Sequence, residues 1–208
     1  MNNRDLKIIF TALKGYVETS YGILLSDQPL HRTNAPDGQE SVGTLDGKHI
    51  YAGNWGDDNM QFTFLNFFHL VGHTIQWHFP DRFSYAYQGQ TLNAREFGLL
   101  DHRGLSVKEG SEVYRYEMDA WRISLGILEQ SGVLQQHSDL TCWISQRAAG
   151  DMEYLNDLYS GRETRLHSEY RPQEFPLLKP MRVPRVGEFH AFVLGEARGA
   201  FTKAALQP

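Results

Sequence analysis

The chain has 208 residues, of which 41% are hydrophobic and 12% aromatic, which is enough apolar material for a sizeable core. Its formal net charge is −5 and no block of like charges occurs, which argues against a nucleic-acid-binding face. A single cysteine, Cys142, cannot form an intrachain disulfide, and its apolar neighbours predict a buried structural thiol. These totals predict one cytoplasmic domain covering residues 1–208.

The first predicted element is a helix over residues 4–18, where apolar side chains recur at helical spacing. Charges at Arg4 and Asp5 interrupt any signal-peptide-like run, and no apolar run approaches the ~18 residues that span a membrane. Residues 26–47 are rich in Pro, Gly, Asp and Asn and are predicted to be a loop. Residues 49–55 are predicted to form a short strand.

Two helices with clear periodicity follow, over residues 60–78 and from Ser111 to Gln130. Between them, residues 81–105 have two glycine-marked breaks, many aromatic side chains and no single periodicity. The sequence therefore predicts a mainly helical α+β fold with a small sheet.

The last third of the chain contains one or two further predicted helices over residues 138–160. Residues 170–186 contain four prolines and are predicted to be extended along the body of the domain. A last strand is predicted over residues 188–195. We therefore expect an extended, Pro-rich C-terminal segment from about residue 170 to residue 208 that wraps the domain.

The helix over residues 60–78 is apolar almost all round, which predicts that it is buried. With about 100° of rotation per residue, its polar side chains fall in one stripe about 80° wide: Asn66, His69, His73 and Gln76. Histidines four residues apart can bind one cation together, at ~2.0–2.1 Å per bond. The alternative is a pair of core or pocket histidines that bond to neighbouring groups. His78 falls outside the stripe and is a poor candidate ligand.

A third ligand is predicted in the helix that starts near Ser111. Glu117 falls inside the apolar face of that helix, whereas Asp119 falls on its solvated side with Arg115 and Arg122. A buried carboxylate needs a metal ion or a hydrogen-bonding partner. Glu117 is therefore predicted to complete a metal site, or else to pair with the histidines directly.

Aromatic residues near these segments favour a small-molecule pocket, because such pockets are mostly apolar with a few polar groups. The predicted pocket residues are Asn66, Gln76, Trp77 and Trp121. Packing in the core is the alternative for the two tryptophans.

Three segments occur in a suggestive order: "HIYAGNW", then "HLVGHTIQW", then "EMDAWRISLGIL". This order resembles the zincin superfamily, in particular gluzincin-like minimal metallopeptidases of the ImmA/IrrE type. The resemblance implies a zincin-like core over residues 49–130, with His69 and His73 as the zinc histidines. It implies Glu117 as the carboxylate ligand, with Asp119 as a competing alignment.

The sequence departs from that family at Leu70, where the family has the glutamate that activates the metal-bound water. The first interpretation is a metal-dependent enzyme that acts on a small molecule or peptide by a different chemistry. Its reaction would be hydrolytic or Lewis-acid catalysed if the metal is zinc, and oxidative if the metal is iron. The second interpretation is a hydrolase in which another residue replaces the missing glutamate as the base. The candidates are Asp57, Asp58, Asp101 and His102. The alternatives are a catalytically inactive zincin-like binding protein, or a helical interaction protein without a metal.

Overall fold

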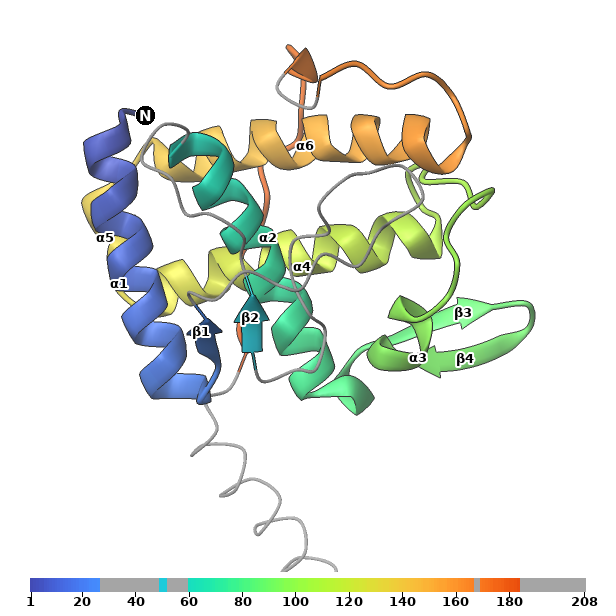
Figure 1. Ribbon diagram of the computed structural model, residues 1–208, viewed down its shortest axis with the longest axis horizontal. Coiled ribbons are helices and arrows are strands. Elements are labelled where there is room, and N and C mark those ends of the chain that lie inside the picture. The colour runs from blue at the N-terminus through green and yellow to red at the C-terminus, as the bar shows by residue number, and fades with distance from the viewer. Residues whose placement is uncertain (27–48, 52–59, 167–168, 184–208) are drawn as a thin grey trace, which may run out of the picture.

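The computed structural model describes residues 1–26, 49–51, 60–166 and 169–183 (Figure 1). The helices and strands follow one another in the order α1 (Asn3–Tyr21), β1 (Leu24–Ser26), β2 (His49–Tyr51), α2 (Met60–His78), the 3-10 helix η2 (Pro80–Arg82), β3 (Ser84–Tyr87), β4 (Gln90–Asn93), α3 (Ala94–Gly98), α4 (Glu112–Gln130), α5 (Val133–Gln136) and α6 (Leu140–Tyr159). The mainly helical α+β fold is thus confirmed.

The four long helices correspond to the four periodic segments of the sequence. Helix α2 has the predicted bounds, and α1, α4 and α6 agree with their predicted ranges to within a few residues. Side-chain caps mark the N-terminal ends of α1 and α4. Asn2 caps α1 by accepting the Asp5 backbone N–H at 2.9 Å, and Ser111 caps α4 by accepting that of Tyr114 at 3.0 Å. The predicted strand over residues 188–195, and most of the predicted loop over residues 26–47, lie outside the described residues.

Two small sheets flank the helices. Strands β1 and β2 pair in parallel, with Leu25 opposite Ile50, and β3 and β4 form an antiparallel hairpin. Residues 81–105 thus contain the hairpin and α3, which the mixed pattern of the sequence did not resolve. The hairpin turn is at Gln88 and Gly89, both with positive φ, as a tight two-residue turn requires.

Helix α4 lies at the centre of the molecule and packs against α2, α6 and the end of α1 (Figure 1). It crosses α2 at Gly72, where an added Cβ atom would overlap the Ala120 carbonyl group. The Ser124 hydroxyl donates to the Phe68 carbonyl at the same crossing. The two backbones can approach this closely because Gly72 has no side chain. The crossing brings the faces of α2 and α4 that carry the predicted site against each other.

Residues 170–183 contain no helix or strand and run along α6 and α4. The Leu178 backbone N–H donates to the Ser145 hydroxyl at 2.9 Å, and the Met181 backbone N–H donates to the Arg122 carbonyl at 2.8 Å. The Val183 carbonyl accepts the Tyr21 hydroxyl at 3.0 Å. For residues 170–183, the extended course predicted from the prolines is therefore found. We refer to these residues as the strap.

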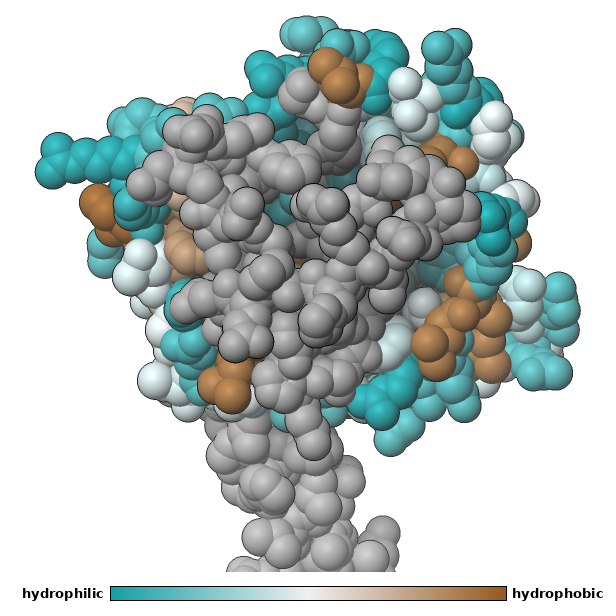
Figure 2. Space-filling view, in the orientation of Figure 1, coloured by the Kyte–Doolittle hydropathy of each residue, from teal (hydrophilic) through white to brown (hydrophobic). Residues whose placement is uncertain are grey.

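Exposed large hydrophobic residues come from separate parts of the described chain: Ile8, Leu24, Leu99, Leu166 and Leu177. On the face shown in Figure 2, the hydrophobic residues form small separate patches among hydrophilic ones. Cys142 is exposed, so the prediction of a buried thiol was wrong. It lies near the start of α6, on the side that faces solvent. None of the helices in the described part of the chain is long and apolar enough to cross a membrane.

Candidate metal centre

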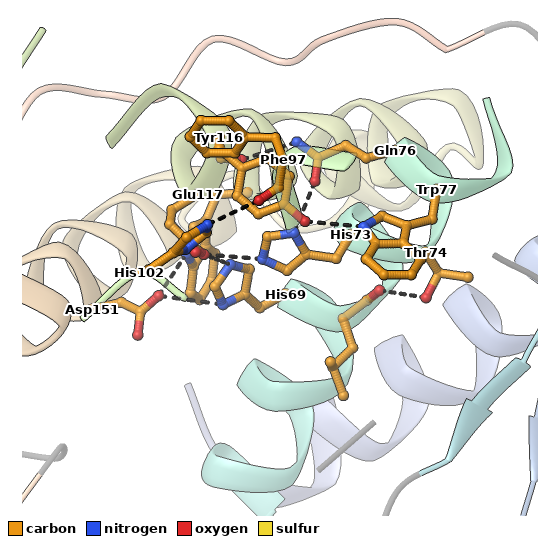
Figure 3. A network of polar contacts seen from close by, with 12 residues as sticks. His69, His73, Thr74, Gln76, Trp77, Phe97, His102, Tyr116, Glu117 and Asp151 are labelled. Atoms are coloured by element: carbon orange, nitrogen blue, oxygen red, sulfur yellow. Dashed lines mark hydrogen bonds and ion pairs between the residues drawn. The ribbon is translucent and has the colours of Figure 1, made fainter. Parts of the chain in front are cut away.

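Helix α2 presents His69 and His73 toward Glu117 of α4 (Figure 3). The Nε2 atom of His73 lies 3.0 Å from Oε2 of Glu117, and the Nε2 atom of His69 lies 3.2 Å from the same oxygen. One ligand atom from each of the three residues lies within 4.8 Å of the others. The structure therefore brings together the three residues predicted to bind a metal, in an arrangement that could hold an ion.

The three residues of the candidate site are largely removed from water. Glu117 is 5% exposed and His73 is 9% exposed, while the side chain of His69 is 18% exposed. The Nε2 atom of His69 is buried and has no hydrogen-bond partner of acceptable geometry. A buried polar atom without a partner is costly, and here it faces a carboxylate oxygen.

The Nδ1 atoms of both histidines face hydrogen-bond acceptors. Oδ2 of Asp151 lies 3.3 Å from Nδ1 of His69, and Oε1 of Gln76 lies 2.8 Å from Nδ1 of His73. An acceptor at Nδ1 favours the tautomer that carries its proton there and leaves the Nε2 lone pair available. Metal-binding histidines are usually held in this way.

Asp151 was missed in the sequence. It comes from α6, it is buried, and its Oδ2 also accepts the Trp121 indole N–H at 3.0 Å. On α6 it lies on the same face as the buried Ile144 and Ala148, so it is an inward-facing carboxylate like Glu117. A helical wheel for residues 138–160 would have shown this.

The protonation of the group follows from its charges. Burial alone would raise the pKa of Glu117, but the charge of His73, the hydrogen bond from His73 and the close approach of His69 outweigh it, so the pKa lies well below its usual value. Burial alone would lower the pKa of His69, but the negative charges of Asp151 and Glu117 raise it above the usual value. Without a metal ion, a proton on His69 therefore stabilises the group.

Two of the four predicted pocket residues contact the histidines. Trp121 stacks on His69, with ring centroids 4.8 Å apart, and Gln76 bonds to His73. Trp77 instead donates to the Tyr116 hydroxyl at 3.1 Å, and Asn66 is partly exposed one turn before His69. Trp77 therefore supports the site through Tyr116, whose ring lies 4.8 Å from that of His73.

Asp119 does not lie on a solvated side of α4, so that prediction was wrong. It is 8% exposed, because the β3 strand covers it: the Tyr85 hydroxyl donates to its Oδ2 at 3.3 Å. Its Oδ1 accepts Nη1 of Arg122 at 3.2 Å. The candidate group contains Glu117 and not Asp119.

The candidate substitute bases lie in different surroundings. Asp101 is exposed and paired with Arg103 at 2.7 Å. His102 is buried between aromatic rings and its Nε2 lies 3.1 Å from the Phe97 carbonyl oxygen. Asp57 and Asp58 lie outside the described residues. Leu70 is partly buried and packs against the core, and His78 packs on Phe79 rather than joining the group.

Two of the distances within the group also fit an ion. Ligand atoms ~2.0–2.1 Å from a tetrahedral metal lie ~3.3 Å apart, close to the two Nε2–Oε2 separations in this site.

Comparison of the chain with family models, with curated proteins and with solved structures finds no match.

Proposed function

We propose that this protein is a metal-dependent enzyme in which His69, His73 and Glu117 hold one divalent ion. The observation that carries the proposal is the buried Nε2 atom of His69, which makes no hydrogen bond of acceptable geometry and lies 3.2 Å from the same carboxylate oxygen that Nε2 of His73 contacts. Two imidazole lone pairs and a carboxylate form a donor set that zinc and ferrous iron both accept.

Three protein ligands leave at least one position for a substrate or water, which is the usual arrangement of a catalytic metal site. The side chain of His69 is 18% exposed, so the site lies near the surface. The ion would act as a Lewis acid toward an oxygen atom of a small-molecule or peptide substrate, with hydrolysis expected for zinc and oxidation for iron.

The order of β2, α2 and α4 supports the proposed relation to gluzincins, since the strand precedes the histidine helix and the third ligand comes from a later helix. Leu70 gives a specific reason for a second candidate, a metal-binding protein without catalysis. Its side chain packs against the core and cannot transfer a proton.

The first test is elemental analysis of the protein purified without added metal, followed by titration with Zn²⁺ and Fe²⁺. We expect about one equivalent of one of these metals for the native chain. His73→Ala and Glu117→Ala should each abolish stoichiometric binding, because either change removes one of three ligands. Retention of full metal content by both variants would contradict the site.

His78→Ala is the matched control, because it removes a histidine of the same helix that lies outside the group. It should keep the native metal content. Circular dichroism shows whether each variant is folded, so that loss of metal is not confused with loss of structure.

A second experiment separates the enzyme from the binding protein. The metal-loaded protein is incubated with a mixture of unstructured peptides and with small ester and amide substrates, and products are followed by mass spectrometry. Products that form with the native chain and not with Glu117→Ala support the enzyme. Stoichiometric metal without any product supports the binding protein.

A further inference from the structure

Arg147 of α6 is partly buried, and its guanidinium group makes few polar contacts. Its Nε atom is buried and has no hydrogen-bond partner. Its Nη2 atom donates to Oε1 of Gln61 at 3.4 Å, which is long for a hydrogen bond, and its Cζ atom lies 5.7 Å from the centroid of the Trp143 ring. A guanidinium group has five N–H donors and is always charged, so the described residues supply few of the acceptors that this group needs.

Arg171 of the strap adds a second positive charge beside this group. The strap approaches α6 closely one turn after Arg147, where an added Cβ atom on Gly150 would overlap the backbone carbonyl group just before Arg171. On the other side of Arg171, the Pro172 carbonyl oxygen accepts the side-chain amide of Gln146 at 3.2 Å. Residue 171 is thus held between two contacts with the part of α6 that carries Arg147.

No carboxylate in the described part of the chain forms an ion pair with Arg147. Asp151, one turn further along α6, instead contacts His69 and Trp121. Burial lowers the pKa of Arg147, and the positive charge of Arg171 lowers it further. Two cations held close together repel each other, and an anion bound between them would remove that repulsion.

We propose that Arg147 and Arg171 form an anion-binding site that takes a phosphate group, either as the free ion or as part of a small molecule. A phosphate group carries ~1.5–2 negative charges at neutral pH and has three strong acceptor oxygens, which match two guanidinium groups better than the single charge of a carboxylate does. Arg171 is exposed, so a ligand can reach the pair from solvent. The site does not include the metal centre and does not rest on the proposed function.

The test is a titration of the metal-free protein with inorganic phosphate at constant ionic strength, followed through the arginine Nε–H signals in a proton–nitrogen NMR spectrum. A buried N–H exchanges slowly with water, so the Arg147 signal should be visible and should shift in a saturable way as phosphate binds. Calorimetry then gives the affinities of the variants. Arg147→Gln and Arg171→Gln should each bind phosphate ~10-fold or more weakly than the native chain, because each change removes a charged donor.

Lys179→Gln is the matched control, because it removes the same charge from the strap at a position over α4, where the Lys179 carbonyl oxygen accepts Nε of Arg122 at 3.3 Å. It should bind phosphate as the native chain does. Arg147→Lys keeps the charge and loses the planar group, so it should bind more weakly than the native chain. Circular dichroism shows which variants are folded. Arg171 is exposed, so Arg171→Gln is informative even if Arg147→Gln does not fold.

Inorganic phosphate is then compared with a simple phosphate monoester. Tighter binding of the monoester supports a phosphorylated small molecule as the ligand, and tighter binding of inorganic phosphate supports the free ion. The absence of a saturable shift in the native chain, or native affinity in Arg171→Gln and in every folded Arg147 variant, would overturn the site. His73→Ala should bind phosphate as the native chain does, so a failure of the proposed metal site is distinguished from a failure of the anion site.

Discussion

The Glu117 carboxylate is almost completely removed from water and lies against two imidazoles. With Asp151, the group contains two acidic side chains and two histidines. A divalent ion would balance the two negative charges while both imidazoles stay neutral. Without an ion, the negative charges can be balanced only by protons, and the charge balance of the group therefore depends on pH.

The stability of the metal-free protein should have a maximum in mildly acidic solution. Glu117 has a pKa lowered from 4.5, so its contribution is present above about that pH and is lost as the pH falls. His69 has a pKa raised from 6.5, so its contribution is complete below that pH and is lost as the pH rises through the higher folded value. Urea denaturation at a series of pH values measures both limits.

With Zn²⁺ bound, the decrease above pH 6.5 should disappear, because the ion takes the place of the protons. The Glu117→Gln variant is the control: it removes one of the two negative charges that raise the pKa of His69, so its alkaline decrease should be smaller than that of the native chain. A metal-free native protein that becomes more stable from pH 6.5 upward would contradict this account.

Helix α2 owes its close approach to α4 to one residue. Gly72 lies between the two histidines in the sequence, and its Cα faces the Ala120 carbonyl. Gly72→Ala should force the helices apart and lower the free energy of unfolding by ~1–3 kcal/mol, a usual cost of overpacking. It should also weaken Zn²⁺ binding, since separation of the helices moves Glu117 away from both histidines.

Gly15→Ala is the comparison, because an added Cβ atom on Gly15 of α1 meets nothing within 4 Å. Alanine has the higher helix propensity, so this variant should be more stable by ~0.5–1 kcal/mol. Both values come from denaturant unfolding. Equal effects of the two substitutions would mean that the α2–α4 contact is not as tight as the structure indicates.

At the scale of the whole molecule, the strap connects three helices by hydrogen bonds. It runs from α6 across α4 to Tyr21 at the end of α1. Gly126 of α4 lies against the Met181 carbonyl, as Gly72 lies against Ala120. Gly126→Ala should displace the strap and make residues 170–183 more sensitive to proteases, with a loss of ~1–3 kcal/mol in unfolding free energy. Limited proteolysis with mass spectrometry measures this. Native-like cleavage rates would show that the strap tolerates the displacement.

Several features could be predicted from the sequence because they depend on residues close together in the chain. The spacing of His69 and His73 and the inward position of Glu117 follow from helical periodicity, which a single segment contains in full. The bounds of α2 follow in the same way, from an apolar run that ends before Pro80.

Other features depend on which segments meet, and periodicity within one helix has no information about that. Asp119 was placed in solvent because the wheel of α4 shows no sign of Tyr85, whose strand covers it. Asp151 belongs to a helix whose contact with His69 arises from packing across about 80 residues of chain. The positions of the three candidate ligand residues on their helices were therefore fixed locally by helix geometry. The residues that support them were fixed by the packing of α2, α4, α6 and β3.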